Sequence, residues 1–166
     1  TNHNPPVWQL HCPVPITRDG ERMTLAHGEG GRLMRKLIRE RIIPRLGGKS
    51  LHSMDDAARL PPIGGSLAVT TDSFVVSPLF FPGGDIGSLA VYGTANDLAV
   101  SGARPLYVTL SLIVEEGLPL AVLDRVLQSV AEAAGRANVR IVAGDTKVVP
   151  RGAADGLFIN TTGVGE

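Results

Sequence analysis

Apolar residues recur along the chain with two periods, one typical of helices and one typical of strands. After a proline-containing stretch over residues 1–23, apolar positions from about residue 31 return every three or four residues until Pro44 and Gly47. This spacing predicts an amphipathic helix that the proline and the glycine end. Residues 24–26 are expected to form a short strand before that helix.

The remainder of the chain alternates expected strands with longer expected helices. Alternating β-branched residues predict a strand over residues 67–72, and recurring small and apolar residues predict a helix over residues 86–100. Further strands are expected over residues 105–114, 139–143 and 157–162, and a further helix over residues 118–137. This alternation predicts an α/β or α+β fold in which a mixed β-sheet packs against helices.

Composition and charge narrow the class of protein. The chain has 166 residues, 43% of them hydrophobic, and its 16 Lys and Arg balance 16 Asp and Glu. A chain without a basic patch is not expected to bind nucleic acid, and no apolar stretch approaches the roughly 20 residues of a membrane span. The single cysteine, Cys12, can form no internal disulfide, which fits the reducing cytoplasm. We therefore expect a cytoplasmic protein with no nucleic-acid or membrane partner.

Four aspartates, Asp56, Asp72, Asp97 and Asp145, lie in or after segments of small or strand-forming residues. Mg²⁺ binds oxygen ligands and bridges carboxylates to nucleotide phosphates, so acids that meet in space are candidates for a magnesium–phosphate site. Each aspartate taken alone fits a helix cap or a turn equally well. Asp97 differs, because a carboxylate on the small, apolar stripe of a helix is costly to bury without a partner. A metal or hydrogen-bonding role is favoured for it.

A glycine-rich segment, HGEGG, precedes the first expected helix. It lacks the GK[ST] ending of a Walker sequence, yet Gly28, Gly30 and Gly31 could present backbone N–H groups to a phosphate. A flexible turn into the helix explains the same glycines equally well. His27 could hold a phosphate, or it could satisfy the backbone of that turn.

Lys147 follows Asp145 by two residues and lies on the same side if the strand continues. An ammonium there could neutralise phosphate, or act as a base if its pKa were lowered. A solvated lysine is the ordinary alternative. The apolar residues Val148 and Val149 that follow it favour the functional interpretation.

Longer strings of residues resemble one family, the hydrogenase expression/formation protein HypE. They are HGEGGRLM (27–34), DDAARL (55–60), TTDSFVVSPLFFPGGDIG (70–87), GTANDLAVSGARP (93–105), EEGLP (115–119) and GDTKVV (144–149). The shorter DDAA, TTD, ND and GD pattern resembles the wider superfamily of aminoimidazole ribonucleotide synthetase, selenophosphate synthetase and thiamine-monophosphate kinase. The resemblance implies a PurM-like amino-terminal domain over residues 24–166, with residues 1–23 as an extension.

The resemblance also implies a particular fold and a particular binding site. It implies a mixed sheet with helices on one face, which pairs with a second copy into a dimeric β-barrel and holds ATP and Mg²⁺ at the interface. The implied metal ligands are Asp56, Asp72, Asp97 and Asp145. The implied ATP-contacting residues add His27, Gly28, Gly30, Gly31, Asn96, Gly144 and Thr146 to these aspartates. Lys147 matches the family's GDTK lysine and is a hypothetical catalytic base.

The implied activity is ATP-dependent dehydration of a carboxyl-terminal S-carbamoyl-cysteine to a thiocyanate, which supplies cyanide to the iron of nickel–iron hydrogenases. The implied partners are the carbamoyltransferase HypF and the HypC–HypD complex. The family's second domain and cysteine tail lie outside these 166 residues, so we expect this chain alone to be incomplete for turnover. Two alternatives stay open: a related phosphotransferase that makes selenophosphate or thiamine diphosphate, and a scaffold that dimerises without catalysis.

Overall fold

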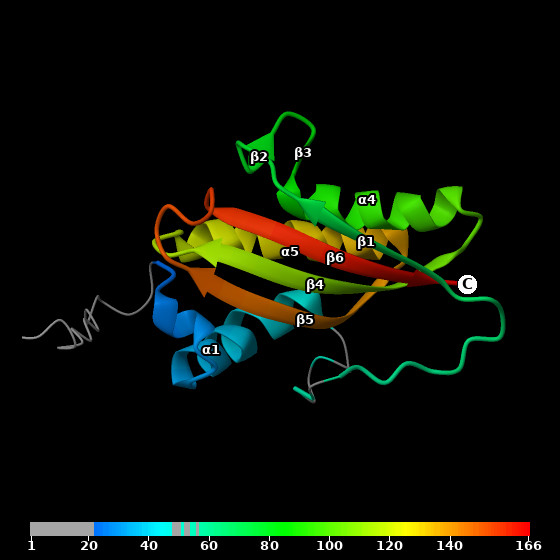
Figure 1. Cartoon of the computed structure of the whole chain (residues 1–166), viewed down its shortest axis with the longest axis horizontal. Helices are drawn as coiled ribbons and strands as arrows, with labels where there is room; N and C mark the ends of the chain where they lie inside the picture. The colour runs from blue at the N-terminus through cyan, green and yellow to red at the C-terminus, as the bar shows by residue number, and fades with distance from the viewer. Residues whose placement is uncertain (1–21, 48–50, 52–53, 56) are drawn as a thin grey trace, which may run out of the picture.

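The computed structural model describes residues 22–47, 51, 54–55 and 57–166. Figure 1 shows one sheet, helices that pack behind it, and a small hairpin above it. The helices are η1 (Leu25–Gly28), α1 (Arg32–Leu37), the π-helical turn η2 (Ile38–Ile42), α2 (Ile43–Leu46), α4 (Ile86–Val100) and α5 (Leu120–Ala137). The strands are β1 (Ala68–Phe74), β2 (Phe80–Phe81), β3 (Gly84–Asp85), β4 (Pro105–Glu115), β5 (Arg140–Val149) and β6 (Leu157–Gly165).

The main sheet has the strand order β1-β6-β4-β5. Strand β6 pairs antiparallel with both β1 and β4, while β4 and β5 run parallel. Parallel neighbours need a crossover connection, and α5 supplies it. Strands β1 and β5 are therefore the two edges of an open sheet. The expected mixed α/β fold is confirmed, and this sheet by itself is not a closed barrel.

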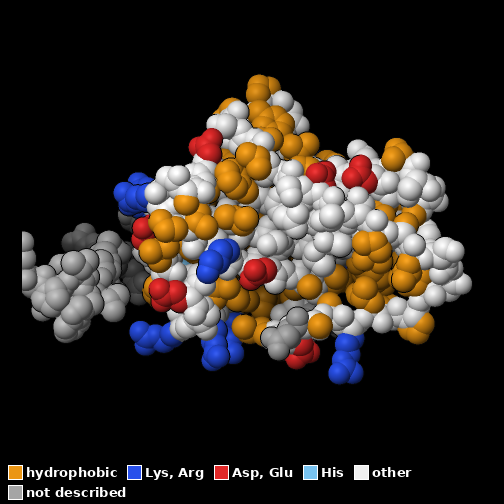
Figure 2. Space-filling model, viewed as in Figure 1, with side chains coloured by type: hydrophobic (Ala, Val, Ile, Leu, Met, Phe, Trp, Pro, Cys, Tyr) orange, Lys and Arg blue, Asp and Glu red, His pale blue; other side chains and the backbone are white. Residues whose placement is uncertain are grey.

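One face of the sheet carries the core. Alternate residues of β4 are buried, as are residues of α5 at helical spacing, which is the pattern expected when a helix covers one sheet face. The residues at the centre of this layer are Val108, Leu110, Leu112, Val114, Leu123, Val126, Leu127 and Val130. No helix of the described residues covers the opposite face, and its middle shows mostly uncharged atoms in the space-filling view (Figure 2).

Helix α4 lies very close to strand β6 because small residues meet there. A Cβ atom added to Gly163 would lie 2.6 Å from the Thr94 methyl carbon. The Thr94 hydroxyl also hydrogen-bonds Thr161 inside this contact. Ala90, Thr94 and Leu98 of the predicted stripe on this helix are buried. Asp85 begins the helix by accepting hydrogen bonds from the N–H groups of the residues at its first turn, over distances of 2.8 and 3.0 Å.

Three expectations about the strands were wrong. Residues 24–26 form no strand: Thr24 instead caps η1. Strand β5 does not end at residue 143 but continues to Val149, because it stays paired with β4 along that whole length. Gly144 allows this pairing, since a Cβ there would lie 2.7 Å from the Leu110 carbonyl oxygen. The GDTKVV string is therefore strand, and Asp72 likewise lies inside β1 rather than at its end.

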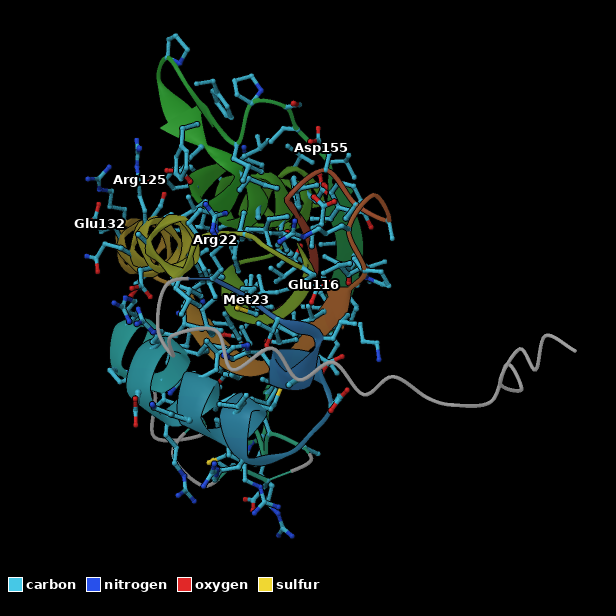
Figure 3. The ribbon with its side chains drawn as sticks, turned by 90° about the vertical axis from the view of Figure 1, so that its left-hand side faces the viewer. Arg22, Met23, Glu116, Arg125, Glu132 and Asp155 are labelled. Atoms are coloured by element: carbon cyan, nitrogen blue, oxygen red, sulfur yellow. The ribbon has the colours of Figure 1, made fainter. Side chains whose placement is uncertain are left out.

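The first helices form one continuous segment, Arg32–Leu46, which we call the helical arm. It lies beside β5 and α5 (Figures 1 and 3). Met23, which precedes η1, is buried, and its N–H donates a 2.8 Å hydrogen bond to the Leu118 carbonyl oxygen. Within the described ranges, no helix is long and apolar enough to cross a membrane. The cytoplasmic location stays a prediction.

Candidate functional site

A cavity of about 210 Å³, which we call the arm cavity, lies between the helical arm and the middle of strands β4 and β5. Its walls are mainly apolar, with Ile38 and Ile42 on the arm and Leu112 on the sheet. Its polar lining comes from Asp55, Asp145 and Thr146. The structure thus brings the DDAARL string beside the GDTKVV string. Asp56 itself lies outside the described residues.

Asp145 and Lys147 occupy alternate positions of β5 and therefore share one side of the strand, as predicted. Asp145 is exposed, and its Oδ1 atom accepts a 2.8 Å hydrogen bond from the Thr146 N–H. Thr146 points to the other side and is buried. Lys147 is exposed at the same edge, in cross-strand register with Ile113 of β4. Gly144 is the strand position that lies tight against β4.

The HGEGG segment packs directly against β5. A Cβ atom added to Gly28 would lie 2.7 Å from the Val148 backbone nitrogen, so only glycine fits this approach. Gly30 has φ +73°, and Gly31 caps α1. His27 Nδ1 accepts a 3.1 Å hydrogen bond from the Thr24 N–H and lies 2.8 Å from the Thr24 hydroxyl. These two contacts fit the turn interpretation of His27, and its phosphate-binding role stays a prediction.

A second group of acidic residues lies at the other edge of the sheet, between β1 and α4. Thr70 donates a 3.2 Å hydrogen bond to Asp97 Oδ2. Asp72 Oδ1 accepts from the Ser73 N–H at 2.8 Å, and its Oδ2 atom faces Gly93 of α4, 3.7 Å from where a Cβ would lie. We call Asp72 and Asp97 the edge aspartates. Asn96, beside them on α4, is exposed.

The expectation that Asp97 sits in a buried stripe of α4 was wrong, because Asp97 is exposed. The buried stripe consists of residues such as Ala90, Thr94 and Leu98, which face β6, whereas Asp97 lies beside Thr70 on the edge strand. Its exposure removes the desolvation cost from which a metal or hydrogen-bonding role was argued. The Thr70 contact leaves the carboxylate open to a ligand from outside the chain.

A single chain does not bring all the predicted aspartates together. Asp72 and Asp145 belong to the two opposite edge strands, three strand spacings or roughly 14 Å apart. They also point to opposite faces of the sheet. Asn160 of β6 is in register with both Ser73 and Ser111, and Ser111 is in register with Asp145, so these four residues share one face. Asp72 is the neighbour of Ser73 in β1 and therefore points to the other face. Among the described residues, no three His, Cys, Asp or Glu side chains form a group that could hold a metal.

Glu115 has a structural role that its string, EEGLP, did not reveal. Its carboxylate accepts hydrogen bonds from the N–H groups of Gly152 and Gly156, the latter at 3.0 Å, and so fastens the loop between β5 and β6. These two bonds, aided by the charge of Arg151, hold the pKa of Glu115 below its usual value. Glu115 is distant in sequence from Gly152 and Gly156, so only the folded loop brings these residues together.

The chain belongs to the family described as AIR synthase related protein, N-terminal domain, whose profile matches residues 54–166. Within it, the chain is similar to carbamoyl dehydratase HypE of Cupriavidus necator: 51% identical over 152 residues, which cover 91% of this chain and 43% of that protein. It therefore spans about two fifths of that relative's length. The resemblance predicted from the motifs is confirmed.

Solved structures show the same similarity in three dimensions. Hydrogenase maturation protein HypE in complex with ATP has a TM-score of 0.83 and 53% identity, covering 86% of this chain and 42% of that one. The HypE–HypF complex contains a chain with a TM-score of 0.60 and 51% identity, covering 78% of this chain and 41% of that one. The described fold is thus that of the corresponding part of these proteins.

Proposed function

We propose that this chain is the ATP-binding domain of a carbamoyl dehydratase that acts in hydrogenase maturation. The observation that carries the proposal is the similarity to the ATP-bound HypE structure, with a TM-score of 0.83 and 53% identity. The reaction removes water from an S-carbamoyl-cysteine, so the carbamoyl group loses its oxygen and both N–H protons and becomes a thiocyanate. ATP supplies the phosphoryl group that makes the oxygen a leaving group. The second domain and the reacting cysteine would lie outside these 166 residues.

The chemistry of the donor groups supports Mg²⁺ as the companion of ATP. Mg²⁺ is usually held through one or two carboxylates together with phosphate oxygens and water. The edge aspartates offer two such carboxylates beside the Thr70 hydroxyl. Asp55 and Asp145, which line the arm cavity, would contribute there. Asp56, the neighbour of Asp55 in the sequence, is proposed as a further ligand. Lys147 is exposed beside Asp145, where it would neutralise phosphate or accept a proton.

A homodimer would join the two acidic regions that one chain keeps apart. The open face of the sheet carries a row of uncharged polar residues in register, Ser73, Asn160 and Ser111, that ends at Asp145. Exposed apolar side chains flank the row, including Val69 at 66% exposure. A twofold axis facing this surface would set β1 of one chain near β5 of its partner and close a dimeric barrel.

The proposed protein partners follow from the relatives. The HypE–HypF complex supports HypF, the carbamoyltransferase, as the partner that delivers the carbamoyl group. The HypC–HypD complex is proposed as the acceptor of the product on the strength of the motif resemblance. Both would engage the whole protein, of which this chain corresponds to about two fifths.

Titration calorimetry of ATP into this chain, with and without Mg²⁺, tests the proposed function. We expect saturable binding that requires Mg²⁺ and that weakens by at least about tenfold in Asp97→Asn, because one carboxylate ligand is lost. Asp155→Asn changes an exposed aspartate in a loop and serves as the matched control. Absence of ATP binding by the wild-type chain, or binding of equal strength in Asp97→Asn, would contradict the proposal.

A further inference from the structure

The helical arm joins two segments that the proposed ATP site uses. The HGEGG segment leads into its first turn, and the DDAARL segment follows its last turn. The arm also forms one wall of the arm cavity, whose other wall includes Gly144 and Asp145. A contact that fixes the arm on the body of the protein therefore also positions the HGEGG segment and the arm side of the cavity.

A charged cluster fastens the arm to helix α5. The Arg41 guanidinium pairs with Asp124 Oδ2, and Arg45 Nη2 lies 3.2 Å from the same oxygen. Arg45 Nη1 donates a 2.8 Å hydrogen bond to the Arg41 carbonyl oxygen, which ties the two arginines together. We call these three residues the arm clamp. Two cations therefore converge on one carboxylate across a contact between elements that are far apart in sequence.

The arm clamp is partly buried, which distinguishes it from ordinary surface pairs. The side chains of Arg41, Arg45 and Asp124 are 32%, 27% and 21% exposed. Within the described residues, the Oδ1 atom of Asp124 is buried and has no hydrogen-bond partner. Loss of the Asp124 charge would leave two arginines without a counter-charge in a place that water screens poorly.

A π-helical turn places the arginines. Over Ile38–Ile42 the helix takes an extra residue per turn, and the Ile43 N–H donates to the Ile38 carbonyl five residues earlier. Ile38 and Ile42 then line the arm cavity while Arg41 and Arg45 face α5. One short segment thus closes the cavity with its apolar side and holds the clamp with its charged side.

We propose that Asp124 is a positioning residue for the nucleotide site. Through Arg41 and Arg45 it holds the helical arm against the body, and so aligns HGEGG and the arm wall of the cavity with the GDTKVV strand. The inference rests on the proposed ATP-binding function. Among the described residues, the ion-pair partners of Asp124 are Arg41 and Arg45, which are not ATP-site residues predicted from the sequence. It acts at a distance, through the arm.

The variant Asp124→Asn tests this role, because it keeps the shape of the side chain and removes its charge. We expect ATP affinity in the presence of Mg²⁺ to fall by about tenfold or more, because the variant breaks a partly buried ion pair that holds the arm in place. Hydrogen–deuterium exchange should rise in peptides covering residues 29–46 and stay unchanged in β4 and β6. Asp124→Glu, which restores the charge, should recover much of the affinity.

Glu132→Gln is the matched control on the same helix. Glu132 and Arg136 are 4.0 Å apart and 54% and 74% exposed, and Glu132 points away from the body in Figure 3. Such an exposed ion pair contributes little to stability, so the ATP affinity and the hydrogen–deuterium exchange of this variant should match those of the wild type. If Asp124→Asn does not fold, Arg45→Gln replaces it, because that variant removes only one partner of the clamp. The same changes in ATP affinity and in hydrogen–deuterium exchange are expected for it.

The outcomes separate this inference from the proposed function. Failure of the wild-type chain to bind ATP would defeat the proposed function. Wild-type binding together with unchanged affinity in Asp124→Asn or Arg45→Gln would overturn the positioning role. Exchange that rises across the whole sheet, rather than in the arm, would show a merely structural role and would overturn it as well.

Discussion

At the scale of single residues, Gly28 is the contact that sets HGEGG on the sheet. A methyl group there would meet the Val148 backbone nitrogen at 2.7 Å, which neither element can relieve without moving. Gly28→Ala should lower the free energy of unfolding by about 1–3 kcal/mol, as overpacking does. Urea denaturation measures it. Gly31→Ala, where nothing lies within 4 Å, is the control and should cost less, because it loses only the preference for glycine over alanine at a helix N-cap. Equal losses in the two variants would disprove the close-approach explanation.

The hydrogen bonds of the Glu115 carboxylate predict that the stability of the protein depends on pH. The N–H groups of Gly152 and Gly156 bind its charged form, so its pKa in the folded protein is lowered. Its contribution to stability is therefore complete above its unfolded pKa of about 4.3 and is lost as the pH falls through the lowered value. Urea midpoints of the wild type and Glu115→Gln should differ most at neutral pH and converge below about pH 4.

The neighbouring substitution Glu116→Gln provides the control for Glu115, since its side chain takes part in neither of these hydrogen bonds. The difference in urea midpoint between Glu116→Gln and the wild type should not change with pH in the same way. A gap between wild type and Glu115→Gln that stays constant from pH 7 to pH 3 would mean that the carboxylate does not fasten the loop through its charge.

At the scale of elements, helix α4 depends on its first turn. Asp85 accepts hydrogen bonds from the Gly87 and Ser88 N–H groups, and the Asp85 N–H donates to the Ser88 hydroxyl. Asp85→Ala should therefore reduce stability by about 0.5–2 kcal/mol, the usual effect of losing such a cap. Thermal unfolding of Asp85→Ala beside Asp155→Ala measures the difference. A loss no larger than that of the loop variant would count against the cap.

Elements whose signals are local were predictable from the sequence, and elements set by distant partners were not. Helix α4 was expected over residues 86–100 and has those bounds, because its cap and the following Gly102 are local features. Strand β5 was expected too short, because its second half is defined by pairing with β4. The π-helical turn and Asp124 gave no sequence signal, since the contact of Asp124 with Arg41 spans 83 positions. Asp97 was placed on α4 correctly, but its exposure depends on where β1 lies.

At the scale of the whole molecule, the open sheet face is the proposed surface between two copies. Val69 of β1 is 66% exposed there, whereas Val100 at the end of α4 is 86% exposed away from it. Val69→Asp should raise the dimer dissociation constant by more than about tenfold, because the interface would bury an unpaired charge. Val100→Asp should leave it unchanged. Light scattering over a dilution series reports both, and a dimer that survives Val69→Asp would place the interface elsewhere.

The central claim is that one ATP site needs the edge aspartates of one chain and Asp145 of another. Asp72→Asn and Asp145→Asn should each abolish magnesium-dependent ATP binding when alone. Mixed in equal amounts and allowed to exchange subunits, they should regain about a quarter of the wild-type binding capacity, since half the dimers carry one intact site of two.

That mixing experiment, read by titration calorimetry, is the most direct measurement. Recovery of binding on mixing would agree with a site shared between two chains. Failure to recover, with subunit exchange verified, would contradict the account, because a site built within one chain stays broken in every combination of the two variants.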